Sequence, residues 1–439
     1  MHLFIVGAGH VGLVTAVGMT RLGHTVTVAD IDGPRIDRLR AGRAPIYEPG
    51  LEDGIAEAGA RLDFTTNLVP ADDVRFAFVV VGTPQGPDGP LSMAHVETAV
   101  RQLLSVTGPE HVIVVRSTLP LSGPASLEGY RGDRPGTPAI VTNPEFMREG
   151  SALRDFASPG RIVTGWLAER DRAAAKGVLD LYAGIQAPTL VADARSVALI
   201  KLASNGFLAM KVAYANELAR LADAFGADAT VVADGMGMDD RIRRSFLDAG
   251  PGFGGSCLPE QAVALSQLAG SAGVPAPVID AVAVANDAHQ RAIVARLAAL
   301  LGGSTTAAAG NGEQSLAGRH VGLLGIAFKA NTDDVRESPS LAIAQRLREA
   351  GATVSATDPQ AIDKALRVDP DLQVGATPLD VASGADAIVI VTEWPEYRTI
   401  DWVACARAMR GDLVFDLRRI VDPAAVAAAG LRPVALGRP

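Results

Sequence analysis

Short, continuously apolar runs recur along the chain, and segments with helical spacing separate them. In the first half these runs read LFIVGAG, TVTVAD, FAFVVVG, VIVVRS, AIVTNP and RIVTGW. Apolar runs without polar alternation are typical of parallel strands buried on both faces, and their alternation with helices predicts a doubly wound α/β sheet. We therefore assign residues 1–195 to a first α/β domain.

The pattern changes after residue 195. Residues 196–227 have an apolar residue about every three or four positions and no proline, which predicts one long helix that could bridge two domains and form a dimer core. We assign residues 196–301 to this central helical region. Residues 302–318, GGSTTAAAGNGEQSLAG, lack periodicity and indicate a flexible linker, although their alanines could form a frayed helix end.

The strand signal returns in the last part of the chain, in HVGLLGIAF, TVSATDP, DAIVIVTEW and DLVFDLR. Residues 319–439 should therefore form a second, smaller α/β domain. The predicted fold class is α/β, with two doubly wound domains joined by a long central helix.

Composition narrows the class of protein. The chain has 439 residues, 48% of them hydrophobic and 20% charged, which is typical of a globular protein of two or three domains. No apolar run approaches the roughly 20 residues that span a bilayer, and the N-terminus shows no secretory signal. Two cysteines allow one disulfide at most, which suits the cytoplasm. The net charge of −9 argues against nucleic-acid binding, and the histidines lack metal-ligand spacing.

The segment FIVGAGHVGLVTA carries a dinucleotide-binding fingerprint. Gly7, Gly9 and Gly12 follow a predicted strand and open a predicted helix, so they permit a tight turn, close approach of a pyrophosphate, and close packing of helix and strand. Asp30 ends the next strand, where a carboxylate binds ribose hydroxyls and repels a 2′-phosphate. The first domain is therefore predicted to be Rossmann-like and to prefer NAD to NADP, a preference that Arg35 could soften. His10 should border the cofactor.

A series of ordered motifs covers nearly the whole chain. They are YEPGL (47–51), VGTP (81–84), STLP (117–120), NPEFMREGSALRDF (143–156), KLASN (201–205), GGSC (254–257) and GIAFKANTDDVRESPSL (325–341). Together they resemble the UDP-glucose/GDP-mannose dehydrogenase family. The resemblance implies oxidation of the C6 alcohol of a nucleotide sugar to a carboxylate with two NAD molecules. It also implies a dimerising central helix and a C-terminal domain that binds the nucleotide.

The chemistry of an alcohol-to-acid oxidation fits these residues. A thiolate at Cys257 can add to an aldehyde, and the resulting thiohemiacetal can lose a second hydride to give a thioester that water hydrolyses. Lys201 and Asn205 share a helix face at i and i+4, which suits stabilisation of an oxyanion. One of Glu145 and Glu149 could act as the base for hydrolysis while the other orders water. The resemblance implies catalytic roles for Thr118, Glu145, Glu149, Lys201, Asn205 and Cys257, with Gln261 beside them.

The fingerprint and the resemblance together predict two sets of binding residues. The cofactor set is Gly7, Gly9, His10, Val11, Gly12, Asp30, Arg35, Gly82, Thr83, Thr118 and Arg336. The substrate set is Glu145, Phe146, Arg148, Glu149, Lys201, Asn205, Arg241, Phe246, Leu247, Gly254, Phe328 and Lys329. The resemblance places Arg241 across the dimer interface and Lys329 on the C-terminal domain.

Each assignment has a purely structural alternative. An isolated cysteine is usually an inert buried residue. For Cys257 the glycine-rich loop argues against this, because such a loop leaves the thiol accessible. Cys405 is interpreted as inert. Lys201 and Asn205 could form a solvated helix face, although the surrounding stretch is strongly apolar. Glu145 and Glu149 could only pair with Arg148 and Arg154. Arg243 and Arg244 are interpreted as surface charges.

The chain departs from the family pattern at two places. The usual ending G-G-S-C-[FL]-P-K-D is GGSCLPEQ here, so Glu260 replaces a lysine and Gln261 replaces an aspartate that handles water near the substrate hydroxyl. Gln261 can hold a water but cannot accept a proton. Glu260 could turn inward and substitute for the aspartate, but the favoured interpretation is a solvated charge. Arg419 replaces the asparagine of D-x-R-N.

Three functional hypotheses follow. The first is an NAD-dependent nucleotide-sugar 6-dehydrogenase, with UDP-glucose as the expected substrate. The second is a dehydrogenase of the same fold that acts on GDP-mannose or an unusual nucleotide substrate, or stops at a different oxidation level. The third is a non-catalytic nucleotide-binding protein, against which the retention of Cys257 and Lys201 argues, because neither is needed for binding alone.

Overall fold

The computed structural model describes residues 1–84, 86, 91–132, 136–302, 304–305 and 314–438. Within these ranges the chain forms two compact units, Met1–Ser204 and Asn205–Pro439, and each is described by itself. The division falls inside the long helix α8 (Ala194–Phe225), which confirms the central helix expected at residues 196–227.

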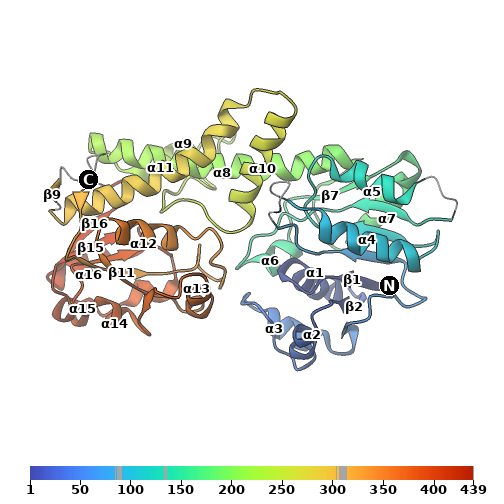
Figure 1. The fold of residues 1–439 in the computed structure, drawn as a ribbon, viewed down its shortest axis with the longest axis horizontal. Helices are drawn as coiled ribbons and strands as arrows, with labels where there is room; N and C mark the ends of the chain where they lie inside the picture. The colour runs from blue at the N-terminus through green and yellow to red at the C-terminus, as the bar shows by residue number, and fades with distance from the viewer. Residues whose placement is uncertain (85, 87–90, 133–135, 303, 306–313, 439) are drawn as a thin grey trace. The chain divides into compact units, whose positions relative to one another are not determined.

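The first unit is built on an eight-stranded sheet with the order β3-β2-β1-β4-β5-β6-β7-β8. Among these strands, Figure 1 labels β1, β2 and β7. Its strands are β1 (His2–Val6), β2 (Thr25–Ala29), β3 (Leu62–Thr65), β4 (Phe76–Val79), β5 (Val112–Val115), β6 (Ala139–Thr142), β7 (Ile162–Trp166) and β8 (Thr189–Asp193). Its helices are α1 (His10–Arg21), α2 (Gly33–Arg40), α3 (Leu51–Ala58), α4 (Ala94–Val106), α5 (Gly123–Arg131), α6 (Ala152–Ala157) and α7 (Arg172–Asp180).

Both faces of this sheet are buried, as the apolar runs predict. On β1, Leu3 and Ile5 belong to one apolar cluster, whereas Phe4 and Val6 belong to another. Because successive side chains of a strand point to opposite faces, the two clusters cover the two sides of the sheet.

One pairing differs from the all-parallel expectation. The neighbouring strands β6 and β7 run antiparallel, whereas the other pairs of this sheet are parallel. The connection between them carries only the six-residue helix α6, which is shorter than the crossover helix that usually joins parallel strands. An apolar run shows that a strand is buried but does not give its direction.

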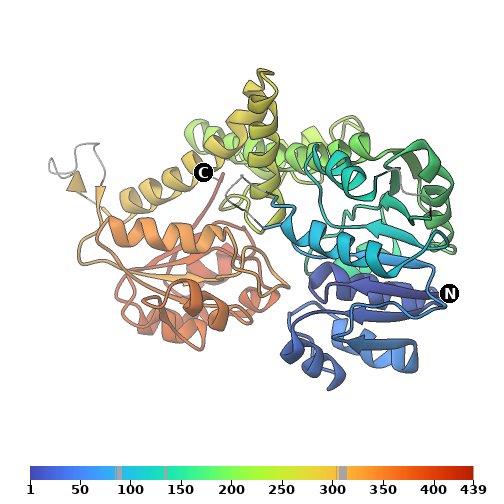
Figure 2. The same ribbon diagram turned by 45° about the vertical axis from the view of Figure 1, so that its right-hand side comes forward.

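The second unit contains the rest of α8, the helices α9 (Ala229–Gly237), α10 (Cys257–Ser271) and α11 (Pro277–Leu300), and a six-stranded parallel sheet. The sheet has the order β13-β12-β11-β14-β15-β16. Its strands are β11 (His320–Leu324), β12 (Thr353–Thr357), β13 (Gln373–Val374), β14 (Ala387–Ile390), β15 (Leu413–Asp416) and β16 (Arg432–Ala435). Its helices are α12 (Pro339–Glu349), α13 (Ile362–Val368), α14 (Pro378–Ala382), α15 (Trp402–Ala408) and α16 (Pro423–Ala428). Figure 2 shows these helices, in orange and red, packed against the sheet.

The expected linker at residues 302–318 is only partly described. Two short antiparallel strands, β9 (Ser304–Thr305) and β10 (Gln314–Ser315), lie at its two ends. Residue 303 and residues 306–313, including the alanines of the proposed helix end, lie outside the described residues.

Helix α8 bears on the sequence-based statement that no apolar run approaches the length of a membrane span. Of the helices in the described ranges, it is the one whose length and composition would allow it to cross a membrane, a test that core helices of globular proteins also pass. The sequence analysis did not count it as a candidate membrane span, because polar residues interrupt its apolar run. One of them, Lys201, is buried in an ion pair.

Candidate active site

The glycine fingerprint has the geometry of a dinucleotide loop between β1 and α1. Gly7 has a φ of 115°, and a Cβ atom there would lie 2.5 Å from the carbonyl oxygen of Val80. A Cβ atom at Gly12 would clash with the carbonyl oxygen of Gly7. At Gly9, in contrast, a Cβ atom would meet no atom of the described residues within 4 Å. Gly7 and Gly12 are thus required by packing, while Gly9 leaves room for a pyrophosphate at the start of α1.

Asp30 follows β2 and braces this loop. Its carboxylate accepts hydrogen bonds from the backbone N–H groups of Ala8, at 2.7 Å, and Asp32, at 3.0 Å. Arg35 donates to the same carboxylate from Nη1 at 3.2 Å and lies 3.4 Å from the carboxylate of Asp32. Two carboxylates therefore balance the one guanidinium, which favours the ribose hydroxyls of NAD over a 2′-phosphate.

Three predicted cofactor segments lie at one edge of the sheet. Strands β1, β4 and β5 are parallel neighbours, and the glycine loop, Gly82–Thr83 and Thr118 follow their carboxyl ends. Ser117 donates from its hydroxyl to the carbonyl oxygen of Val81 at 2.6 Å, which ties the second and third segments together. This is the edge at which doubly wound sheets bind dinucleotides.

Glu145 and Lys201 form a buried ion pair within the first unit. The Nζ atom of Lys201 lies 2.9 Å from Oε1 of Glu145 and donates to the backbone carbonyl oxygen of Glu145 at 2.6 Å. The other carboxylate oxygen accepts from the N–H of Met147 at 2.6 Å. Burial favours the neutral acid, but Lys201, Arg116 and this N–H outweigh it and lower the pKa of Glu145. Glu145 is therefore a carboxylate at neutral pH, and Lys201 is not on a solvated face.

The remaining predicted residues of the 143–156 segment behave differently from one another. Phe146 lies under two cations, with the guanidinium of Arg161 3.8 Å and the Nζ of Lys201 5.4 Å from its ring centre. Arg148 is exposed and pairs with Asp155 at 2.7 Å, not with Glu145. Glu149 is half-buried, and its charge contributes to raising the pKa of His10.

In the second unit, Asn205 contacts Gln261. Asn205 donates from Nδ2 to Oε1 of Gln261 at 2.9 Å, and both side chains are buried. Gln261 thus supplies the hydrogen-bond acceptor that an aspartate would supply there, but not a site for a proton.

Cys257 is the first residue of α10. The thiol is half-buried, and its Sγ lies 3.6 Å from the hydroxyl of Ser256. A cysteine at a helix N-terminus faces unpaired backbone N–H groups, which favour the thiolate. Cys405, in contrast, is buried within α15, where burial and the charge of Asp401 raise its thiol pKa to about 11. The two cysteines are not joined in a disulfide.

Glu260 lies in the first turn of the same helix and is half-buried, so the expectation of a solvated charge is not met. Burial raises the pKa of Glu260, the charges of Glu337 and Asp334 add to this effect, and Arg336 opposes it. These charges act on Glu260 because the 334–337 segment lies against the loop before α10, where Gly255 donates from its N–H to the carbonyl oxygen of Arg336 at 3.0 Å. The sequence of α10 alone does not contain this arrangement.

The glycine-rich loop before Cys257 is held by side chains of α8 and α11. Gly250 donates from its N–H to Oδ1 of Asn216 at 2.8 Å and accepts at its carbonyl oxygen from Nε2 of His289 at 2.7 Å. Asn286 makes two bonds to the backbone of Phe253, at 2.9 and 3.1 Å. Burial lowers the pKa of His289 to about 4, so the ring is neutral and its Nδ1 accepts from Arg220.

This set of loop supports was missed from the sequence. Asn286 and His289 stand in the helical segment ANDAHQ, where two polar side chains spaced three apart beside buried apolar positions are the available signal. The loop itself needs its glycines, because Gly255 has a φ of 79° and a Cβ atom there would lie 2.8 Å from the ring of Phe328.

The predicted basic residues have distinct surroundings. Arg241 is highly exposed and pairs with Asp239 at 2.6 Å. Lys329 lies 5.2 Å from the ring centre of Phe328, and Arg336 bonds to Asp334. Arg244 pairs with Asp234 and Asp248 at the surface, as expected.

Two adjacent arginines after β15 take different partners. Arg418, which the sequence analysis missed, lies against the glycine-rich loop, with its Nη1 3.1 Å from where a Cβ atom of Gly250 would stand. Arg419, the departure from the family pattern, donates to the hydroxyl of Thr230 at 2.8 Å. An asparagine side chain would be too short to make the same bridge to α9.

No cluster of three or more His, Cys, Asp or Glu side chains suited to a metal ion occurs in the described part of the chain.

Comparison with known proteins covers the chain from end to end. Residues 1–186 match the NAD binding domain of the UDP-glucose/GDP-mannose dehydrogenase family, residues 195–288 its central domain, and residues 322–423 its UDP binding domain. A UDP-glucose 6-dehydrogenase of Rhizobium meliloti is 38% identical over the full length of both chains. One from Bacillus subtilis is 36% identical and covers 100% of this chain and 98% of its own.

Solved structures agree in sequence and fold. The structure of a UDP-glucose dehydrogenase from Pyrobaculum islandicum has a TM-score of 0.86 and 37% identity, and the match covers 100% of this chain and 98% of that one. Three consecutive domain matches and full-length relatives above 30% identity lead to one conclusion: the chain belongs to the UDP-glucose/GDP-mannose dehydrogenase family.

Proposed function

We propose that this chain is an NAD-dependent UDP-glucose 6-dehydrogenase that converts the C6 alcohol of its substrate to a carboxylate. The observation that carries the proposal is the cysteine at the N-terminus of α10, retained in a chain that matches UDP-glucose 6-dehydrogenases over its full length. A binding protein would need neither this thiol nor the buried Lys201.

The cofactor site suits NAD. The open space above Gly9, the N-terminus of α1 and the carboxylate of Asp30 are the groups that would hold its pyrophosphate and adenosine ribose. Bound NAD supplies the hydride acceptor for each of the two oxidations.

The protein groups handle the protons and the carbon centre. In the first oxidation the C6 alcohol loses a hydride and a proton, and the Asn205–Gln261 pair can hold the water that carries this proton away. The Cys257 thiolate then forms a C–S bond to the aldehyde carbon, and the carbonyl oxygen takes up a proton to give a thiohemiacetal. Loss of a second hydride and the hydroxyl proton leaves a thioester. Water adds to the thioester carbon, the C–S bond breaks, and the carboxylate leaves while the thiol is restored.

Charge placement supports these steps. The Lys201 ammonium can stabilise the oxyanions that form at C6 in each addition, because it is buried and its charge is poorly screened. With its lowered pKa, Glu145 is a weak base and serves as the carboxylate partner of Lys201. Glu149 is therefore the better candidate for taking a proton from the hydrolytic water.

We further propose a homodimer in the cytoplasm. Helix α8 exposes Phe207, Tyr214 and Leu221, spaced seven residues apart, which is a pattern suited to packing against a second helix. In such a dimer Arg241, exposed in the single chain, would contact the substrate phosphates of the partner protomer.

A second candidate function is oxidation of another nucleotide sugar, such as GDP-mannose. The replacement of the first-step aspartate by Gln261 and the bridge made by Arg419 favour it. Incubation of the protein with NAD and a panel of nucleotide sugars distinguishes the two, with products identified by mass. We expect two NADH for each UDP-glucuronate formed. Turnover confined to another nucleotide sugar would support the second candidate, and no turnover with any would reject both.

A further inference from the structure

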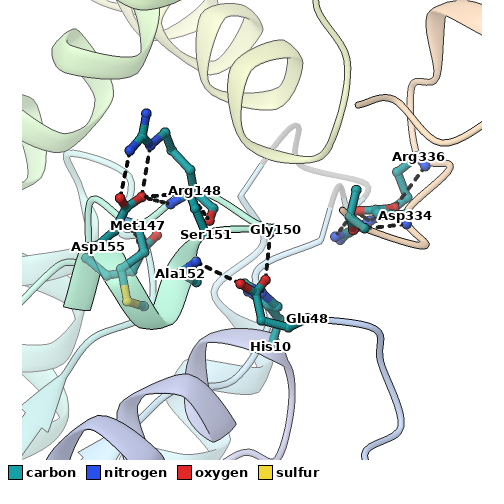
Figure 3. Close-up of polar contacts among 12 residues, drawn as sticks. His10, Glu48, Met147, Arg148, Gly150, Ser151, Ala152, Asp155, Asp334 and Arg336 are labelled. Carbon is teal, nitrogen blue, oxygen red and sulfur yellow. Dashed lines mark hydrogen bonds and ion pairs between the residues drawn. The ribbon is translucent and has the colours of Figure 1, made fainter. Parts of the chain in front are cut away.

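Glu48 is a buried carboxylate that no step above uses. It lies between α2 and α3, and its side chain is only 1% exposed. Its Oε2 contacts Nε2 of His10 at 2.7 Å and accepts from the N–H of Gly150 at 2.6 Å, while Oε1 accepts from the N–H of Ala152 at 2.8 Å (Figure 3). All four residues belong to the first unit. One carboxylate therefore joins three segments that are far apart in sequence.

The first of these contacts reaches the cofactor loop. His10 directly follows Gly9 and is the first residue of α1, the helix end at which a dinucleotide pyrophosphate binds. Burial opposes protonation of the ring, but the carboxylates of Glu48, Glu149 and Glu145 outweigh it and raise the pKa of His10 above its usual 6.5. Glu48 thus favours the protonated form of His10 beside the predicted pyrophosphate site.

The other two contacts reach the segment that carries the proposed catalytic glutamates. Gly150 follows Glu149, and Ala152 is the first residue of α6, whose N–H has no partner within its own helix turn. By accepting from both N–H groups, Glu48 fixes the backbone immediately after Glu149. Removing the carboxylate would leave one half-buried and one buried donor without their partner and the segment free to shift.

We propose that Glu48 is a positioning residue that holds the NAD loop and the Glu145–Glu149 segment in one fixed arrangement. Loss of Glu48 then weakens NAD binding through His10 and slows acid formation through Glu149. The proposal rests on the proposed function for its catalytic half, whereas its NAD half concerns binding alone.

The test is Glu48→Gln, which keeps the size of the side chain and removes its charge. Charge-assisted hydrogen bonds are among the strongest in proteins, so we expect the Kd for NAD, measured by calorimetry without substrate, to rise about tenfold or more. The rate of acid formation at saturating NAD should fall by a similar factor. The matched control is Glu52→Gln, four residues later, whose carboxylate accepts from Ala44 at the surface. In Glu52→Gln, the Kd for NAD and the rate of acid formation should both stay within about twofold of the wild-type values.

The pH dependence of NAD binding separates positioning from simple stabilisation. In the wild type, the affinity should fall as pH rises through the pKa of His10, which Glu48, Glu145 and Glu149 keep raised. In Glu48→Gln this fall should move to lower pH, and in His10→Gln it should disappear. The double variant should bind NAD no more weakly than the weaker single one, because both changes break the same contact.

Two results would overturn the proposal. One is a Glu48→Gln protein with a lower Tm but an unchanged Kd and pH profile for NAD, which would make Glu48 merely structural. The other, decisive if that variant does not fold, is a His10→Gln protein with unaltered NAD affinity at every pH. Because NAD binding is measured without substrate, absence of UDP-glucose oxidation by the wild type would reject the proposed function and leave this test intact.

Discussion

The two cysteines show how position decides the chemistry of one residue type. Cys257 begins a helix after a glycine-rich loop, whereas Cys405 lies inside α15 with its thiol pKa raised to about 11. Their different settings can be predicted from the sequence, because loop glycines and helical spacing are local signals; the role of Cys257 as the nucleophile stays a prediction. The pairing of Glu145 with Lys201 was not predicted, since the two residues are 56 positions apart and only the folded chain brings them together.

Replacing Cys257 by alanine should abolish the second oxidation. Without the thiolate no thioester can form, so UDP-glucuronate should disappear. NAD binding should stay within about twofold, because Cys257 is not among the predicted cofactor residues. Product analysis by mass, with Cys405→Ala as the control that should remain active, tests this. Unchanged acid formation by Cys257→Ala would return the thiol to a packing role.

Asp30 should make the protein prefer NAD. A carboxylate that braces the glycine loop would repel the 2′-phosphate of NADP, so we expect kcat/KM with NAD to exceed that with NADP by at least about tenfold. Steady-state kinetics with both cofactors measure this ratio. Equal efficiency would identify Arg35, which already contacts Asp30, as a ligand for the 2′-phosphate.

The altered motif ending at Gln261 should limit the first oxidation. A general base typically contributes about 10² to 10⁴-fold, and Gln261 offers an acceptor to Asn205 without a site for a proton. Glu260→Lys and Gln261→Asp together should therefore raise the rate of UDP-glucose oxidation tenfold or more. No rise would indicate that the native ending is matched to a different substrate, and the second candidate function would then be preferred.

Among the elements, the strands and the long helix were largely predictable from the sequence. The side chains that hold the glycine-rich loop before Cys257 were not. Continuous apolar runs mark β1, β4 and β5 because these strands are buried on both faces. The same signal gave no direction for β7, which pairs antiparallel with β6. The polar side chains of α11 that hold the glycine-rich loop were missed, because each partner lies more than 30 positions away.

These supports should matter for catalysis although they touch no reacting atom. Asn286→Ala removes two hydrogen bonds from the backbone of Phe253, four residues before the thiol. We expect kcat for acid formation to fall about tenfold, because a misplaced nucleophile loses much of its effective concentration. The Kd for NAD should be unchanged, since neither Asn286 nor Phe253 belongs to the predicted cofactor set. Ala288→Ser, on an exposed position of the same helix, is the control that should retain wild-type kcat.

At the scale of the whole molecule, two exposed features in the described chain suit contact with a second protomer. Helix α8 exposes large apolar side chains, with Phe207 58% and Leu221 54% exposed, and Arg241 has an 89% exposed side chain. Isolated exposed apolar residues are ordinary, but three at heptad spacing indicate an interface. In a homodimer, a second protomer would cover the apolar residues of α8, and Arg241 would contact the substrate phosphates bound by that protomer.

A mixed dimer tests whether the protomers share their active sites. Cys257→Ala and Arg241→Ala should each be nearly inactive alone, the first for lack of a nucleophile and the second for lack of a phosphate ligand. In a two-fold symmetric heterodimer purified through two different tags, one site combines the intact Cys257 of one protomer with the intact Arg241 of the other. That site should restore about half of the wild-type activity, because the second site lacks both groups. Activity that stays at the level of the single variants would place Arg241 in the same protomer's site or outside the site altogether.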